Sequence, residues 1–159
     1  MRMFSQGPSE QELVAEAERR RRSPVSGRFA FRLPGGSDPA EVSKHLSVST
    51  ARARGGYMAG QFHQPTADLI DTLQGIADAA ATPEPAVDVR LDQWGAQRVH
   101  KVLLASRDRA DDGDVRNAVD AVLAQWDRFS GWRPEAEAIE AARPPRIAAG
   151  DGGWLPVSA

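Results

Sequence analysis

Residues 65–83 read PTADLIDTLQGIADAAATP, and their apolar side chains recur three and four positions apart. That spacing places them on one face of an α-helix. Thr66 is expected to cap the N-terminus of this helix, and Pro83 is expected to end it. The predicted buried face consists of Leu69, Ile70, Leu73, Ile76, Ala77 and Ala80. A helix with such a face must pack against other elements, so this segment predicts a helical core.

Two further segments show the same helical period. Residues 91–106 carry Leu91, Trp94, Val99, Val102 and Leu103 on one face, and residues 113–132 carry Val115, Val119, Val122, Trp126 and Phe129. Asp112 or Asp114 is expected to begin the later helix, and Gly131 is expected to end it. A weaker helix is predicted over 134–142. These helices are the predicted core.

Two short strands are predicted from an alternating pattern. In GRFAFRL, residues 27–33, Phe29, Phe31 and Leu33 alternate with more polar or smaller residues, and AVDVRL, residues 86–91, repeats the alternation. Two such strands form only a marginal ribbon unless helices cover it. The predicted fold is therefore mainly α, α+β at most. It has a compact core of three to five helices, a small two-stranded β element and extended termini.

The two ends of the chain differ in composition from its middle. We predict a charged helical arm over residues 1–26, a single core domain over 27–142 and an extended tail over 143–159. The polar helix expected within 8–24 ends in four consecutive arginines, and GGWLPV in the tail is typical of a docking peptide. The residues predicted to dock a partner are Arg19, Arg20, Arg21, Arg22, Trp154 and Leu155. For the arginines, the alternative is a solvated helix end.

The charges are unevenly distributed along the 159 residues. Residues 1–60 hold ten basic and six acidic side chains, whereas residues 61–159 hold ten basic and sixteen acidic ones. Such asymmetry favours either contact with a polyanion or self-complementary packing of subunits. The chain has no cysteine, which excludes disulfides and thiolate metal sites, and it has no apolar run of bilayer length. We expect a cytoplasmic or virion protein without membrane contact.

Residues 41–56 read EVSKHLSVSTARARGG. Residues 41–54 resemble a helix-turn-helix DNA-binding domain, with Val48 at the buried corner. The resemblance implies nucleic-acid contacts by Lys44, Ser49, Thr50, Arg52 and Arg54. The sequence departs from the family at Gly55-Gly56, which would end the second helix after fewer than two turns. The alternative interpretation is a capped helix, a corner and a glycine-rich loop.

No cluster of residues with catalytic or metal-binding spacing is evident. His45, His63 and His100 have no second ligand beside them, and DRADDGD, residues 108–114, lacks the ligand spacing of a calcium loop and predicts an acidic turn before the next helix. We therefore expect no enzyme, cofactor, metal or small-molecule substrate. The predicted function is a non-catalytic structural or adaptor subunit of a larger protein assembly, of phage virion or tail type by class-level expectation, with other protein subunits as partners. The alternative is a helix-turn-helix DNA-binding transcriptional regulator that uses residues 39–54.

Overall fold

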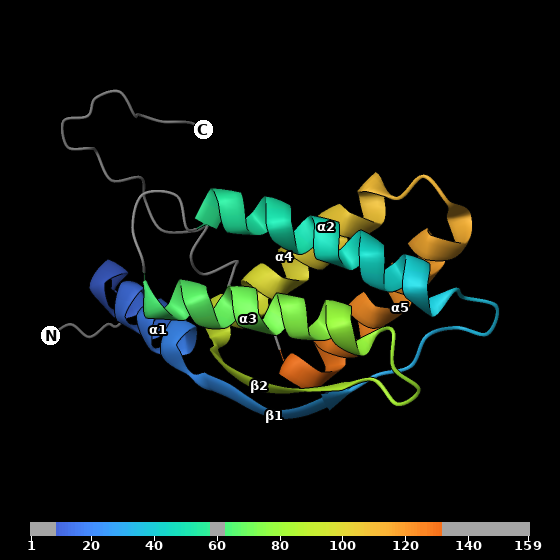
Figure 1. Ribbon diagram of the computed structural model, residues 1–159. Coiled ribbons are helices and arrows are strands. Elements are labelled where there is room, and N and C mark those ends of the chain that lie inside the picture. The colour runs from blue at the N-terminus through green and yellow to red at the C-terminus, as the bar shows by residue number, and fades with distance from the viewer. Residues whose placement is uncertain (1–8, 58–62, 132–159) are drawn as a thin grey trace, which may run out of the picture. The chain divides into compact units, whose positions relative to one another are not determined.

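The structure of the chain is a computed structural model that describes residues 9–57 and 63–131. Within these residues seven elements follow one another: α1 (Glu10–Arg22), β1 (Pro24–Ala30), α2 (Pro39–Tyr57), α3 (Gln64–Ala79), β2 (Ala86–Asp92), α4 (Gln93–Arg109) and α5 (Gly113–Ser130) (Figure 1). Among the described residues, 22–57 and 63–131 belong to one compact unit, and 9–21 belong to another. The predicted fold class, mainly α with a two-stranded element, is confirmed. The helix predicted over 134–142 and the tail over 143–159 lie outside the described residues.

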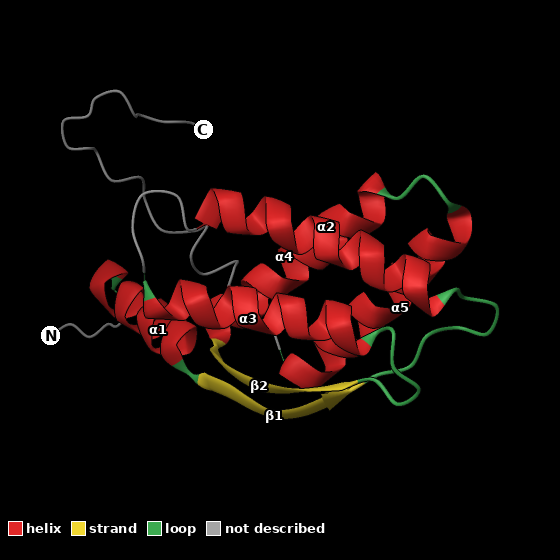
Figure 2. Ribbon diagram, viewed as in Figure 1, coloured by secondary structure: helices red, strands yellow, loops and turns green. Residues whose placement is uncertain are grey.

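Strands β1 and β2 form an antiparallel ribbon in which Phe29 lies opposite Val87 and Gly27 opposite Val89. The ribbon lies against the helices, as Figure 2 shows, and buries Phe29 and Val89 on its inner face. The first strand spans Pro24–Ala30 rather than the predicted 27–33. Phe31 still donates its backbone N–H to Pro85, at 3.1 Å, but the ladder between the two strands ends before it.

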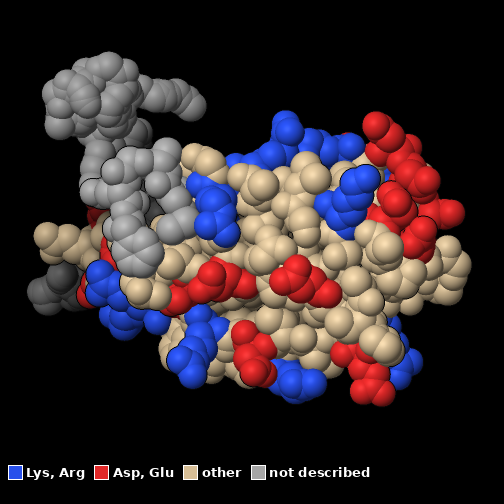
Figure 3. All heavy atoms as spheres, viewed as in Figure 1, with Lys and Arg blue, Asp and Glu red and all other residues tan. Residues whose placement is uncertain are grey.

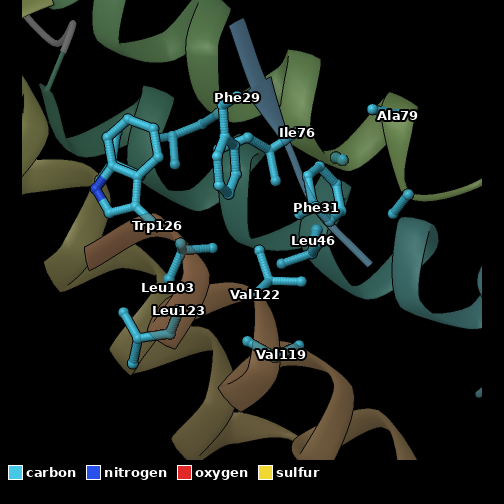
Figure 4. Packing of buried hydrophobic residues seen from close by; sticks show 14 of the residues in the cluster. Phe29, Phe31, Leu46, Ile76, Ala79, Leu103, Val119, Val122, Leu123 and Trp126 are labelled. Carbon is cyan, nitrogen blue, oxygen red and sulfur yellow. The ribbon is translucent and has the colours of Figure 1, made fainter. Parts of the chain in front are cut away.

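Aromatic side chains from the ribbon and from α5 meet in the core (Figure 4). The ring of Phe29 stacks on that of Phe31 at 5.1 Å between centroids and forms a T-shaped pair with that of Trp126 at 5.3 Å. Trp126 is fully buried, and its indole N–H donates to the backbone oxygen of Ala96 at 3.1 Å. The one polar atom of this indole is thus satisfied, which removes the cost of burying it.

The faces predicted for the core helices are confirmed more closely than their ends. All six residues of the predicted face of α3 are buried. However, α3 begins at Gln64, with His63 at the N-cap and Pro65 in the first turn. Thr66 is therefore inside the helix rather than its cap, as expected for a chain in which proline takes an initial helical position. The helix ends at Ala79, before Pro83.

Helices α4 and α5 begin at aspartate caps. Asp92 accepts a hydrogen bond from the backbone of Gly95 at 2.8 Å, so α4 starts at Gln93 and the predicted first residue, Leu91, belongs to β2. Asp112 accepts from the backbone of Asp114 and of Val115, which confirms the predicted acidic turn before α5. Gly131 ends α5 in the left-handed conformation, at φ 63°, as predicted.

Candidate binding surface on helix α2

Helix α2 runs without interruption through the stretch where the sequence predicts two helices and a corner. It begins after Asp38, whose carboxylate accepts from the backbone of Ala40 at 3.1 Å, and it continues to Tyr57. Ser49 does not cap a second helix. Its hydroxyl lies 3.1 Å from the backbone oxygen of His45, one turn back. The predicted corner is therefore wrong, and Gly55 and Gly56 lie within the same helix.

The inner side of α2 buries Val42, Leu46, Ser49 and Thr50. Thr50 donates to the backbone oxygen of Leu46 at 3.0 Å, and both hydroxyl-bearing residues are 2% exposed. Two of the five residues predicted to contact nucleic acid, Ser49 and Thr50, therefore face the core instead. Their hydroxyls are already satisfied by groups of the same fold, so they have no donor or acceptor left at the surface.

Polar contacts hold α2 against α4. Nε2 of His45 donates to the backbone oxygen of Ser106 at 2.8 Å, since a carbonyl oxygen can only accept. The hydroxyls of Ser49 and Ser106 lie 2.7 Å apart, and Arg109 donates to Ser49 at 3.2 Å. Ser106 is fully buried and cannot reach water, so the loss of these contacts would leave its polar groups without a hydrogen-bond partner. The contacts thus hold this side of α2 against α4, together with the buried Val42 and Leu46.

The outer side of α2 carries Lys44, Val48 and Arg52, each one turn from the next, with Arg54 also exposed. We name these four residues the basic face of α2. Val48 is 51% exposed, and among the described residues it is the one large hydrophobic side chain with such exposure. The sequence predicted it to be buried at a corner, and without the corner it points outward. The three cations make no ion pair with any residue in the described ranges.

Helix α3, beside α2, has the opposite charge. Its three charged side chains are all aspartates, of which Asp71 and Asp78 are exposed and Asp68 is half-buried. Figure 3 shows basic side chains along α2 and acidic side chains along α3 on one face of the molecule. We call Asp71 and Asp78 the acidic stripe of α3. Their spacing of seven positions, two helical turns on the polar side of α3, is a signal in the sequence from which this stripe could have been predicted.

The residues predicted to dock a partner lie partly in α1 and partly outside the described residues. Ser9 and Glu12 form a reciprocal cap at the start of α1, with Ser9 N donating to Glu12 Oε1 at 2.8 Å and Glu12 N to Ser9 Oγ at 3.1 Å. Arg19 pairs with Glu16 on the same helix. Arg20, Arg21 and Arg22 also belong to α1, whereas Trp154 and Leu155 lie outside the described residues.

Other polar groups of the described ranges form ion pairs and hydrogen bonds with close neighbours. Nδ1 of His100 lies 2.8 Å from Asp127. Arg107 donates hydrogen bonds to Asp120 and to Asp108, and these bonds raise the pKa of its guanidinium. Within residues 9–57 and 63–131, no three metal-ligating side chains gather at one point. In the same ranges, no helix has the length and apolar character needed to cross a bilayer.

Comparison with protein-family models, curated proteins and solved structures finds no match for this chain. The binding properties of the candidate surface are therefore inferred from its own residues. The basic face of α2 combines an exposed branched apolar side chain with long cationic ones, whose methylene stems add apolar area beneath their charges. Chemically, this surface suits a partner that offers both apolar and anionic groups.

Proposed function

We propose that this protein is a non-catalytic subunit of a protein assembly and that it binds a partner chain through the basic face of α2. The observation that carries the proposal is Val48, 51% exposed between Lys44 and Arg52. A protein surface with carboxylates around a small apolar patch would cover the valine and pair with both cations. We propose a phage virion or tail-type structure as the setting, because this is the kind of assembly expected for a small non-catalytic subunit.

Nucleic-acid binding is the second candidate, because Lys44, Arg52 and Arg54 are exposed cations without an ion pair in the described ranges. Burial of Ser49 and Thr50 leaves these three side chains to contact phosphate groups, which carry no sequence information. A titration of duplex DNA at several salt concentrations tests this candidate. If the candidate is correct, we expect the affinity for DNA to fall steeply with salt and to drop further in Arg52→Ala and Arg54→Ala.

Site-specific photo-crosslinking in the cells that produce the protein tests the first proposal. One variant carries a photoreactive amino acid in place of Val48, and the control variant carries it in place of Asp88, whose side chain is 88% exposed on the outer face of the ribbon. We expect position 48 to form an adduct with one protein chain, identified by mass spectrometry, and position 88 to form none. Lys44→Glu with Arg52→Glu should abolish the adduct.

Three outcomes contradict the proposal. The first is an absence of protein adducts at position 48, and the second is the same set of adducts at both positions. The third is an adduct of position 48 with nucleic acid, which would favour the second candidate.

A further inference from the structure

We propose that the partner at the basic face of α2 is a second copy of this chain, bound so that α2 of each copy lies on α3 of the other. This inference rests on the proposed function and names its partner. It concerns a face formed by both helices, which we define by Lys44, Val48 and Arg54 on α2 and Asp71 and Asp78 on α3. We call it the α2/α3 face.

Charge complementarity is the first reason. The exposed charges of α2 are the cations Lys44, Arg52 and Arg54 and one anion, Glu41, in its first turn, so α2 is basic on balance; the exposed charges of α3 are two aspartates. Figure 3 shows that the two signs lie side by side on one face of the molecule. Two faces of this kind attract each other when they meet with α2 of each copy on α3 of the other, because each basic helix then lies on an acidic one. In any arrangement that stacks α2 on α2, like charges would meet.

The relative level of the two helices is the second reason. They lie side by side and run in opposite directions (Figure 1), and Nε2 of Gln74 on α3 donates to the hydroxyl of Ser47 on α2 at 3.4 Å. From this contact Lys44 lies three residues back along α2, and Asp78 lies four residues onward along α3. At about 1.5 Å per helical residue, both are displaced by about 5 Å in the same direction. Lys44 and Asp78 therefore lie at one level.

A two-fold axis that runs parallel to the helices, between the two faces, preserves that level. It places Lys44 of one copy opposite Asp78 of the other. Arg54 is seven residues beyond Ser47 and Asp71 three residues before Gln74, so they differ in level by four helical residues, about 6 Å, within reach of an arginine side chain. Because the axis is two-fold, each contact occurs twice, and the arrangement closes as a dimer.

The size of the face predicts the strength of the dimer. Helix α2 has 19 residues and α3 has 16, so at about 1.5 Å per residue and about 10 Å of width each they offer about 500 Å² per copy. A standard stable interface buries about 800 Å² per partner. We therefore expect a weak, concentration-dependent dimer that salt dissociates, since most of its contacts are between charges at an exposed rim.

Sedimentation equilibrium of the full-length protein tests the inference with two charge-reversed variants. The first, Lys44→Glu with Arg54→Glu, makes both helices of the face acidic. The second, Asp71→Lys with Asp78→Lys, makes both helices basic. We expect each variant alone to have a dissociation constant at least about tenfold above that of the unmodified chain, because repulsion replaces attraction at four positions. We expect an equimolar mixture of the two to form a heterodimer, because each acidic helix then meets a basic one.

A matched control is Asp88→Lys, which reverses a charge on the outer face of the ribbon, and it should leave the dimer unchanged. Circular dichroism melts of all variants show that each is folded. The inference is overturned if the unmodified chain is a monomer at high concentration and low salt. It is also overturned if the mixture of variants stays monomeric, or if the variants dimerise like the unmodified chain.

These outcomes are separable from those of the proposed function. A monomeric chain whose position 48 crosslinks to a different protein would overturn the dimer and leave the proposed function intact. A dimer that ignores the charge reversals would use another surface and would overturn this inference alone. The absence of any protein adduct at position 48 would contradict both the proposed function and the dimer.

Discussion

The side-chain amide of Gln125 pairs with both backbone polar groups of Arg32. Its Oε1 accepts from the backbone N–H of Arg32 at 3.0 Å, and its Nε2 donates to the backbone oxygen of Arg32 at 2.8 Å. Strand β1 ends at Ala30, so a side chain of α5 takes the position of a neighbouring strand just beyond the ladder. This pairing fixes the segment that leads from the ribbon to α2.

Replacement of Gln125 by alanine should therefore destabilise the fold. It removes two hydrogen bonds to the backbone, and we expect the free energy of unfolding to fall by about 1–2 kcal/mol, measured by urea denaturation. Asn117→Ala, at an exposed position of the same helix, is the control and should change the stability by less than about 0.5 kcal/mol. Equal effects of the two substitutions would contradict the role of this pairing.

Gly75→Ala should destabilise the protein although alanine favours a helix. A Cβ at this position of α3 would lie 2.5 Å from Cγ2 of Val87 on β2, well inside contact distance. We expect a loss of about 1–3 kcal/mol, typical of overpacking, in a thermal or urea melt. Val87→Ala in the same chain removes the clashing atom, so the double variant should lose less than the sum of the single losses. Additive losses would contradict this explanation.

Gly55→Ala should have the opposite effect. Gly55 lies inside α2, and a Cβ there would meet no atom within 4 Å. Alanine in an open helical position is better than glycine by about 0.5–1 kcal/mol, so we expect the melting temperature to rise. If the chain instead left the helix before this residue, as the resemblance to a helix-turn-helix domain implied, alanine would bring no such gain.

The cap of α5 can be tested with two adjacent aspartates. The carboxylate of Asp112 accepts from two backbone N–H groups at the start of the helix, at 2.7 Å and 3.2 Å. We expect Asp112→Ala to lower the free energy of unfolding by about 1 kcal/mol, by urea denaturation. Asp111→Ala removes the same charge from the preceding position, where no hydrogen bond to the helix start is formed, and should cost much less. The prediction fails if both variants lose the same stability.

Local patterns predicted the core well. The spacing of Leu69, Leu73 and Ile76 identified the buried side of α3, and the alternation around Phe29 identified a strand, because such periods follow directly from helix and strand geometry. The helix ends were less predictable. Thr66 and His63 could each have preceded the first turn, and the neighbouring proline favoured the earlier one.

The candidate surface could be predicted only in part. Lys44, Arg52 and Arg54, which were predicted to contact nucleic acid, are exposed, whereas Val48 was expected to be buried and Ser49 to lie at the surface. These two errors have one cause, the corner that the structure lacks. The exposed valine and the acidic stripe of α3 became visible only when the unbroken helix was placed beside its neighbour.

The sequence by itself determined the apolar sides of α3, α4 and α5, since these depend on residues a few positions apart. Around Ser49 it favoured a corner, but a serine hydroxyl that can cap a new helix can also bond back within an existing one. Ser106, 57 positions away, decides between them by placing its hydroxyl 2.7 Å from that of Ser49. Such a contact exists only after α2 and α4 have packed together, so the outward direction of the basic face is a property of the tertiary structure.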